Sequence, residues 1–326
     1  MIDLLFTSVG RRAELLSLFK SEFQNFGRIV AADQSNTAPA LYAADLACTL
    51  PPIMAPDYID IVLELCKKEN IRGISTLIDP EILPLTKNAK RFEHNNVMVF
   101  HSSLEVSELC FDKYETFQFL SRNGFMTPLT FPSFKDFSKA YDRKEIDFPV
   151  FVKPRTGSGS VGIEKIESLE ELQRLFGKRP EYIVQEYMDV EEYDADVYVD
   201  KISGKLVSAF TKKKLSSRIG GADKTVSFKD PLLLELIERF VEKIGLSGPC
   251  DIDLFKKDGE YYISEINPRF GGAYLHAHAC GVNFPKLVQN NLRGRSNECQ
   301  IGNYEEGIYM MMYDSVVFKK ETELVI

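Results

Sequence analysis

The sequence has no CxxC pair among its six cysteines and no apolar run long enough to cross a membrane. Paired cysteines are the usual ligands of a structural zinc ion, and a membrane-spanning helix needs about 18 apolar residues in succession. We therefore expect reduced thiols, no disulfides, no structural zinc, and a soluble protein without a membrane partner. No signal peptide is recognisable either, so the expected location is the cytoplasm.

An excess of basic residues is also lacking, since the formal charge is -8 and the isoelectric point is near 5.3. This argues against general binding to nucleic acid, although a local basic cleft can still hold an anionic ligand. The 326 residues are 44% hydrophobic and 27% charged. A chain of this size and composition can form two or three packed layers or domains.

The first hundred residues alternate between strand and helix patterns, which predicts a parallel α/β sheet. The expected strands are 2–9, 27–33, 71–78 and 96–100, and the expected helices are 11–23, 58–70 and 83–94. Ligands collect at strand ends in such sheets. The residues expected there are Ser8 to Arg12, Asp33, and Asp79 to Glu81, which ordinary turns and caps would also explain.

A dinucleotide-binding fingerprint is missing. Gly10 after the first strand and Asp33 after the second have nearly the spacing of such a unit, but TSVGRR supplies one glycine where GxGxxG needs three. The backbone therefore has no provision for close approach to a pyrophosphate. An NAD-binding oxidoreductase is the least favoured interpretation.

A glycine-rich loop follows the strand pattern VFVK. After Lys153 it places glycines at 157, 159 and 162 among two serines, a composition that turns backbone N–H groups toward a phosphate. It is not a P-loop, because GxxxxGK[ST] is absent. A hairpin tip without a ligand is the alternative. A helix is expected over 107–123, and the main domain change near residues 100–115.

The segment ISEINPRFGG places Glu265, Asn267 and Arg269 on one face of an extended chain. Strands over 250–255 and 261–266 with a turn at Asp258-Gly259 predict a β-hairpin that brings Asp253 beside Glu265. Facing carboxylates repel each other. A hard cation such as Mg²⁺ between them, with Asn267 as a further ligand, would explain the pair. An exposed acidic hairpin is the alternative.

Two further segments allow two interpretations each. Residues 211–228 place five cations around two glycines, which suits either a lid that closes over phosphates, with Arg218 as its preferred residue, or a surface loop. His276 and His278 would form a metal pair if the chain were extended. We favour packing for these histidines, because no third ligand is evident and the segment also suits the start of a helix.

The order of these motifs resembles the ATP-grasp superfamily, and more narrowly stand-alone proteins similar to the carbamoyl phosphate synthase large subunit with a single ATP-grasp unit. The motifs are Asp112-Lys113, the Lys153 strand with its loop, QEYM at 185–188, EEYDADV at 191–197, GGADKT at 220–225, and the hairpin. The resemblance implies a Rossmann-like α/β domain over 1–106 followed by an ATP-grasp fold over 107–326. The latter would comprise a nucleotide lid at about 115–188 and a metal-binding part at about 189–326.

The same resemblance implies the roles of individual residues. The nucleotide-binding residues are Lys113, Lys153, Ser158, Gly159 and Ser160 at the phosphates, Gln185, Glu186, Tyr187 and Met188 at the adenine, and Glu192 at the ribose. Asp253, Glu265 and Asn267 hold Mg²⁺, with Mn²⁺ as an alternative ion, and Arg269 and Arg218 are catalytic. Asp253 departs from the family, where glutamate is common at this position.

The implied activity is ATP-dependent ligation of a carboxylate to an amine, or to a thiol, through an acyl phosphate. Carbamoyl phosphate synthesis itself is not expected, because that enzyme uses two such units and a glutaminase partner. The alternative from another class is a nucleotide-binding regulatory or scaffold protein without turnover. The expected partners are small carboxylates and amines, with a homodimer also considered.

Overall fold

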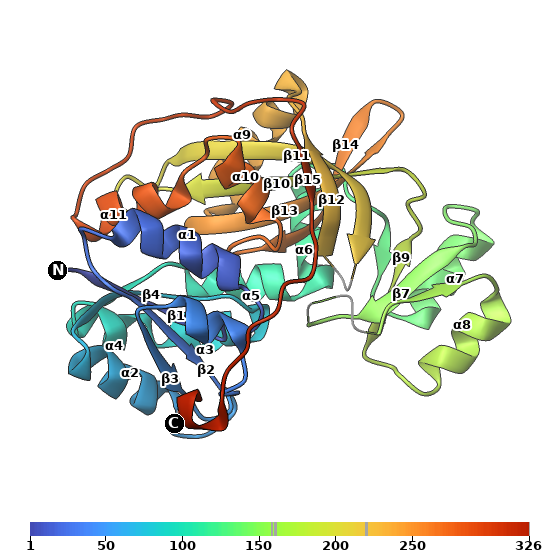
Figure 1. Ribbon diagram of the computed structural model, residues 1–326. Coiled ribbons are helices and arrows are strands. Elements are labelled where there is room, and N and C mark those ends of the chain that lie inside the picture. Colours follow the sequence, from blue (N-terminus) through green and yellow to red (C-terminus); the bar gives the residue numbers. More distant parts are fainter. Residues whose placement is uncertain (158, 160–161, 219–220, 326) are drawn as a thin grey trace.

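The structure is a computed structural model that describes residues 1–157, 159, 162–218 and 221–325. Within these residues the strands form three sheets, of five, six and four strands. Figure 1 shows the two larger sheets in one large body and the four-stranded sheet in a smaller lobe beside it. The residues around the candidate site come from all three parts.

The first sheet is parallel, as the alternating pattern predicted. Its order is β3-β2-β1-β4-β5, with β1 (Asp3–Thr7), β2 (Ile29–Asp33), β3 (Leu46–Thr49), β4 (Ile71–Thr76) and β5 (Met98–Val99). The accompanying helices are α1 (Ala13–Phe23), α2 (Tyr58–Lys68), α3 (Asp79–Lys87) and α4 (Ala89–His94). β3 was not predicted, because it is four residues long, only half-buried and flanked by the turn η1 (Pro39–Ala43) and two prolines.

The helix predicted over 107–123 is two helices, α5 (Leu104–Phe111) and α6 (Lys113–Arg122). Asp112 separates them, because its backbone is extended and its carboxylate accepts hydrogen bonds from the N–H groups of Tyr114 and Glu115. An aspartate in this position stabilises the first turn of the following helix. Arg155 pairs with the same carboxylate at 2.7 Å, which fixes the break beside the four-stranded sheet.

The four-stranded sheet is antiparallel and forms the core of the small lobe. Its order is β6-β9-β7-β8, with β6 (Thr130–Phe131), β7 (Val150–Pro154), β8 (Glu164–Ile166) and β9 (Tyr182–Glu186). The helices α7 (Phe134–Asp142) and α8 (Leu169–Phe176) pack against Val150 and Val152. Since neighbouring residues of a strand point to opposite faces, Lys153 points away from these helices.

The six-stranded sheet is antiparallel, in the order β14-β13-β10-β11-β12-β15. Its strands are β10 (Glu191–Val199), β11 (Leu206–Arg218), β12 (Gly221–Ser227), β13 (Gly248–Lys257), β14 (Glu260–Asn267) and β15 (Tyr309–Met311). The helix α9 (Pro231–Ile244) covers one face. On the other face, α10 (Tyr274–Ala279), α11 (Phe284–Leu292) and α1 pack around Tyr198 and Phe210. The rest of that second face carries the charged residues of the site.

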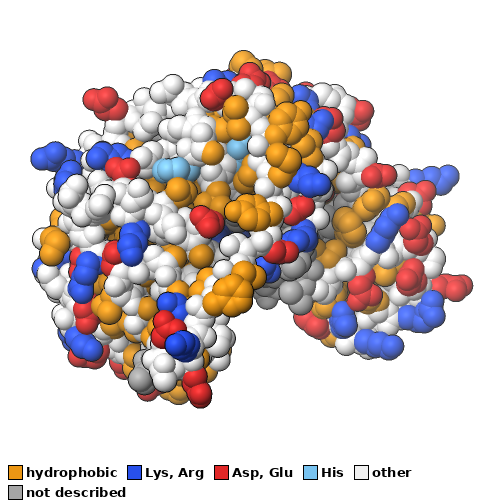
Figure 2. All heavy atoms as spheres, in the orientation of Figure 1, with side chains coloured by type: hydrophobic (Ala, Val, Ile, Leu, Met, Phe, Trp, Pro, Cys, Tyr) orange, Lys and Arg blue, Asp and Glu red, His pale blue; other side chains and the backbone are white. Residues whose placement is uncertain are grey.

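After β15 the chain runs back over the large body to the first sheet (Figure 1). Asp314 on this C-terminal tail contacts both Arg11 and Arg218, and Val325 donates its N–H to Tyr42. Figure 2 shows hydrophobic side chains along the path of the tail and acidic and basic side chains interspersed over the same face. In the described part of the chain, no helix has the length and apolar character needed to cross a membrane.

Candidate functional site

The predicted β-hairpin is present and is formed by β13 and β14. Asp258 and Gly259 make its turn with positive φ angles of 52° and 87°, which aspartate and glycine tolerate better than most residues. Asp253 pairs directly with Glu265. A register shift beside Asp253 inserts Ser264 as an extra residue, and without this bulge Ser264 would face Asp253. The prediction that the two carboxylates lie side by side is confirmed.

Asp253, Glu265 and Asn267 share one face of this hairpin, and we call them the metal clamp. The ammonium group of Lys214 contacts Asp253, and the amide nitrogen of Asn267 lies 3.4 Å from the second carboxylate oxygen. Attraction to Asp253 raises the pKa of Lys214 despite its burial. Glu265 forms no hydrogen bond or ion pair with a described side chain. Two carboxylates and an amide oxygen are a donor set that suits Mg²⁺.

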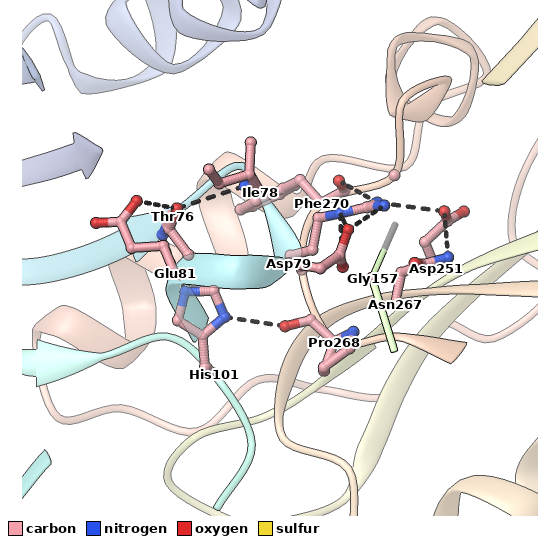
Figure 3. Close-up of polar contacts among 12 residues, drawn as sticks. Thr76, Ile78, Asp79, Glu81, His101, Gly157, Asp251, Asn267, Pro268 and Phe270 are labelled. Atoms are coloured by element: carbon pink, nitrogen blue, oxygen red, sulfur yellow. Dashed lines mark hydrogen bonds and ion pairs between the residues drawn. The ribbon is translucent and has the colours of Figure 1, made fainter. Parts of the chain in front are cut away.

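A hollow lies against the metal clamp and connects the three parts of the molecule. Its lining includes Asp79 at the start of α3, Gly157 from the small lobe, and Glu265 and Asn267 from the hairpin. Figure 3 shows Asp79, Gly157, Asp251 and Asn267 grouped around this point. Residues from distant parts of the sequence therefore face one space.

The two predicted phosphate-binding lysines lie at the entrance of the glycine loop. Lys113 donates a hydrogen bond to the carbonyl oxygen of Gly157 at 2.6 Å. Lys153 is buried, and this burial lowers its pKa, with repulsion from Lys113 acting in the same direction and Glu265 opposing it. Gly159 is exposed, with open space around its Cα. Ser158 and Ser160, also predicted to bind nucleotide, lie outside the described residues.

The predicted adenine-binding residues lie at the end of β9 and directly after it. Gln185 and Glu186 are the last two residues of the strand, and strand pairing stops at Glu186. Gln185 is buried and donates to the hydroxyl of Thr130. Glu186 accepts from Lys257 at 2.8 Å, which ties the small lobe to the hairpin. The next two residues differ: the Tyr187 ring packs edge-on against Phe151, whereas Met188 is buried. Among the described residues, residues 187 and 188 take part in no strand pairing.

The segment predicted as a cationic loop at 211–228 consists mainly of the two antiparallel strands β11 and β12. Strand alternation sorts its cations, so Lys212 and Lys214 face the site while Lys213 pairs with Glu191. Arg218 is half-exposed and bonds to Asp314 of the tail at 2.6 Å. In this arrangement its guanidinium is engaged outside the metal clamp.

Sequence reasoning missed a second group of acids on the same face, which we call the acidic cluster: Asp194, Asp196 and Asp251. One carboxylate oxygen from each lies within 4.8 Å of the others, and all three residues are buried. Lys212 donates to Asp194 at 2.8 Å and to Asp196 at 2.5 Å. The motif EEYDADV contained the signal, because its alternation places Glu192, Asp194 and Asp196 on one face, but only Glu192 was assigned a role.

Burial raises the pKa of each carboxyl group in the acidic cluster. For Asp251 the pKa rises to about 7, because burial and repulsion from Asp194 outweigh attraction to Arg269 and Lys212. Burial therefore disfavours the ionised form of all three carboxyl groups on this face of the sheet. Glu192 lies at the outer end of the same row and forms no hydrogen bond with a described side chain.

Arg269 lies between the first sheet and the hairpin. Its guanidinium pairs with Asp79 at 3.2 Å and with Asp251 at 3.4 Å. Attraction to these acids raises its pKa even though burial opposes the charge. Arg12, from the loop after β1, donates to the carbonyl oxygen of Gly271 at 2.5 Å, and burial lowers its pKa to about 10. Both arginines thus face the acidic cluster.

Two other sequence signals are explained by local contacts. Asp33 accepts hydrogen bonds from the N–H groups of Gly10 and Ser35, so its carboxylate closes a loop. His276 is helical, and its ring nitrogens contact the Thr225 hydroxyl and the Ile308 carbonyl. His278 lies two positions further along the same helix, which does not place the two rings on one face. The arrangement agrees with packing rather than a metal pair.

Comparisons with known proteins divide the chain in two. A model described as the PylC-like N-terminal domain matches residues 4–100, and a model of the ATP-grasp domain matches residues 110–273. Carbamoyl-phosphate synthase of Methanobrevibacter smithii is 25% identical over 246 residues, 71% of this chain and 66% of its own length. Coenzyme gamma-F420-2:alpha-L-glutamate ligase of Methanococcus maripaludis is 27% identical over 187 residues, 52% of this chain and 62% of its own length.

The chain thus spans less than two thirds of the length of each of these relatives. Among solved structures, the biotin carboxylase domain of the Hydrogenobacter thermophilus 2-oxoglutarate carboxylase has a TM-score of 0.77 at 17% identity. That match covers 95% of this chain and 73% of the other, which was solved with MgADP and bicarbonate. Because the ATP-grasp model covers half of the chain, this protein belongs to the ATP-grasp family.

Proposed function

We propose that the protein is an ATP-dependent carboxylate–amine ligase that works through an acyl phosphate. The observation that supports this best is that Glu265 and Asn267 of the metal clamp line one hollow together with Asp79 and Gly157. Lys153 lies near Glu265, and Arg269 pairs with Asp79 of the same lining. An unpaired Glu265 beside buried cations suits a site that receives a phosphate with its metal ion. A relative named as a glutamate ligase supports ligation as the reaction class.

The nucleotide would lie between the small lobe and the six-stranded sheet. Lys113 and Lys153 would neutralise its phosphates as compact point charges, and Ser158, Gly159 and Ser160 are also proposed to bind nucleotide. Gln185, Glu186, Tyr187 and Met188 would border the adenine, where the end of the β9 ladder leaves backbone groups free. Glu192 would accept hydrogen bonds from the ribose hydroxyls.

Asp253, Glu265 and Asn267 would hold Mg²⁺, or alternatively Mn²⁺. The ion would supply charge neutralisation at the phosphates. Lys214 contacts Asp253, so this carboxylate has one cationic partner within the chain. We propose that Lys214 shifts from Asp253 toward the phosphates when the nucleotide binds.

In the first step, a carboxylate oxygen of the substrate attacks the γ-phosphorus, and the bond to the leaving ADP breaks. Arg269 would stabilise the charge on the transferred group. In the second step, the amine lone pair attacks the acyl carbon and inorganic phosphate leaves with its electron pair, while the amine releases a proton. A thiol acceptor would follow the same sequence to a thioester. No protein nucleophile is required.

Two measurements test this proposal. Thermal unfolding should shift upward with Mg²⁺-ATP but not with NAD, and a ligand at a hundredfold excess over its dissociation constant adds roughly 2.7 kcal/mol. ADP release should then require both a carboxylate and an amine in a panel of paired substrates. ATP binding without any turnover would favour the regulatory alternative, and a shift with NAD alone would favour the oxidoreductase. The domain limits, a homodimer and the cytoplasmic location remain predictions.

A further inference from the structure

The acidic cluster lies next to the metal clamp on the same face of the six-stranded sheet. Asp251 is two residues before Asp253 on β13, so both side chains point to the same face. Asp194 and Asp196 pair with Asp253 and Asp251 on the neighbouring strand. Two residues of a strand span about 7 Å. A small substrate with one end at the clamp can therefore place its other end at the cluster.

Two oxygen atoms of the cluster, Oδ1 of Asp196 and Oδ1 of Asp251, have no hydrogen-bond partner among the described residues. Only 1% of Asp196 and 6% of Asp251 is exposed, so bulk solvent does not supply the missing donor. Lys212 uses the other oxygen of Asp196, and Arg269 uses the other oxygen of Asp251. Buried acceptors without a donor are rare in native proteins and call for an explanation.

The two unpartnered oxygens converge on one point beside Gly271. A Cβ atom on Gly271 would lie 2.5 Å from Oδ1 of Asp196 and 2.7 Å from Oδ1 of Asp251. Both carboxylates therefore pack against the Gly271 backbone, and a side chain at this position would displace them. A Cβ on the neighbouring Gly272 would meet no atom within 4 Å. A side chain at position 271 would therefore clash with the cluster, whereas one at position 272 would not.

When every carboxyl group is ionised, including that of Asp251, the local charges are one positive charge short of balance. The cluster and the nearby Asp79 supply four carboxylates, whereas Lys212, Arg12 and Arg269 supply three cations. A divalent ion would exceed the missing charge. A primary ammonium group supplies one charge and three N–H donors, which fits both the charge and the two free acceptors.

An ammonium group held by carboxylates is stabilised in its protonated form. A protonated nitrogen has no lone pair and cannot attack an acyl phosphate. The group bound here is therefore not the attacking amine but a second, non-reacting ammonium on the carboxylate substrate. Arg269 reaches from Asp251 toward Asp79 at the hollow, so a carboxylate next to that ammonium would face a guanidinium.

We propose that the acidic cluster binds the ammonium group of the carboxylate substrate, and that this substrate is an amino acid or a compound with a primary ammonium close to its carboxylate. The inference rests on the proposed ligase function and names its substrate class. Asp196 and Asp251 hold the ammonium group, and the lack of a side chain at Gly271 lets both carboxylates keep their positions. The metal clamp and Arg269 then face the carboxylate end.

The test uses hydroxylamine as the amine, because it traps an acyl phosphate as a hydroxamate whatever the natural acceptor is. Hydroxamate formation is measured with Mg²⁺-ATP and matched pairs: glycine and acetate, alanine and propionate, glutamate and glutarate. We expect the amino member of a reacting pair to have at least about a ten-fold higher kcat/KM, a ratio that corresponds to about 1.4 kcal/mol.

Substitutions in and beside the acidic cluster test whether the ammonium group is bound there. Gly271→Ala and Asp196→Asn should raise the KM for the amino acid by about ten-fold or more, with the KM for ATP unchanged. Gly272→Ala is the matched control and should keep both values. Because Asp196→Asn removes a buried charge and can impair folding, the thermal unfolding temperature is measured for each variant, and Gly271→Ala provides the independent test.

Three results would overturn the inference. Equal activity with a des-amino acid would show that no ammonium is recognised, although the ligase function would stand. A change in Mg²⁺ dependence in Asp196→Asn without a change in the KM for the amino acid would assign the cluster to a metal ion. If no carboxylate of any pair gave hydroxamate while ATP still bound, the proposed function would fail together with the inference.

Discussion

Asp253 and Glu265 face each other across the β13–β14 ladder, and only Asp253 has a cationic partner among the described residues. Lys214 offsets part of the repulsion between these two carboxylates. Glu265 remains the unpaired acid of the clamp. Removing the charge of Glu265 should therefore affect stability differently from removing the charge of Asp253.

Replacing Glu265 with glutamine should abolish turnover without lowering the stability of the ligand-free protein. At an effective dielectric constant of about 20, two charges 4 Å apart repel by roughly 4 kcal/mol, and Lys214 and solvent reduce the gain to a small part of this. The lost anionic ligand should prevent metal-dependent phosphoryl transfer. Thermal unfolding and ADP release are measured on one preparation.

Glu260→Gln is the control for this variant, because Glu260 is an exposed acid on the same strand, outside the clamp. It should leave turnover unchanged. Retained turnover in Glu265→Gln would contradict the metal clamp. A large loss of stability with normal activity per folded molecule would instead indicate a structural role for Glu265.

Lys153→Ala should weaken ATP binding by about ten- to a hundred-fold while the fold persists. A hydrogen bond to a charged group contributes about 1.5–3 kcal/mol, and burial already disfavours the charged lysine in the absence of ligand. Calorimetric titration with Mg²⁺-ATP checks the affinity. Lys135→Ala, which removes an exposed lysine from α7 of the same lobe, should bind ATP normally. Equal affinity in both variants would show that Lys153 does not contact the nucleotide.

We expect His101 to make the free energy of unfolding depend on pH between about 6.5 and 4. Its Nε2 accepts from the N–H of Thr76 and its Nδ1 lies 2.9 Å from the Pro268 carbonyl, so the folded protein holds a neutral ring (Figure 3). Burial lowers its pKa to about 4, against an unfolded value near 6.5. Since the unfolded chain binds the proton first, stability is full above pH 6.5 and falls as pH drops, by roughly 3 kcal/mol near pH 4.

Urea unfolding at several values across this pH range measures the effect. His101→Gln should lower stability at pH 7.5 but reduce the pH slope relative to the unsubstituted protein. His94→Gln is the matched control, because His94 is exposed and should leave the slope unchanged. An identical slope in His101→Gln would refute this assignment.

Arg218 has to leave Asp314 if it is to reach a bound phosphate. Arg218→Ala should therefore lower kcat, whereas Asp314→Asn, which frees the same guanidinium, should not. Both side chains are exposed, so neither change should alter the unfolding temperature measurably. Steady-state ADP release separates the cases. If both substitutions reduce kcat equally, Arg218 acts by anchoring the tail rather than by contacting the substrate.

Local sequence was sufficient for the elements that carry the chemistry. The alternation of Glu265, Asn267 and Arg269 and the Asp258-Gly259 turn predicted the hairpin, because strand period and turn conformation are properties of a few adjacent residues. The strand–helix alternation of the first hundred residues predicted the parallel sheet for the same reason. By contrast, the break at Asp112 was missed although its capping aspartate was visible in the sequence.

The sequence by itself determined which residues line each strand face, and the tertiary structure alone decided which faces meet. Lys153 near Glu265, Arg269 against Asp79, and Lys212 between Asp194 and Asp196 join residues from separate elements. Periodicity reports the direction of a side chain along its own strand, but burial of apolar surface sets how sheets and lobes pack. The acidic cluster became a candidate binding site only when that packing placed its carboxylates, two arginines and Gly271 together.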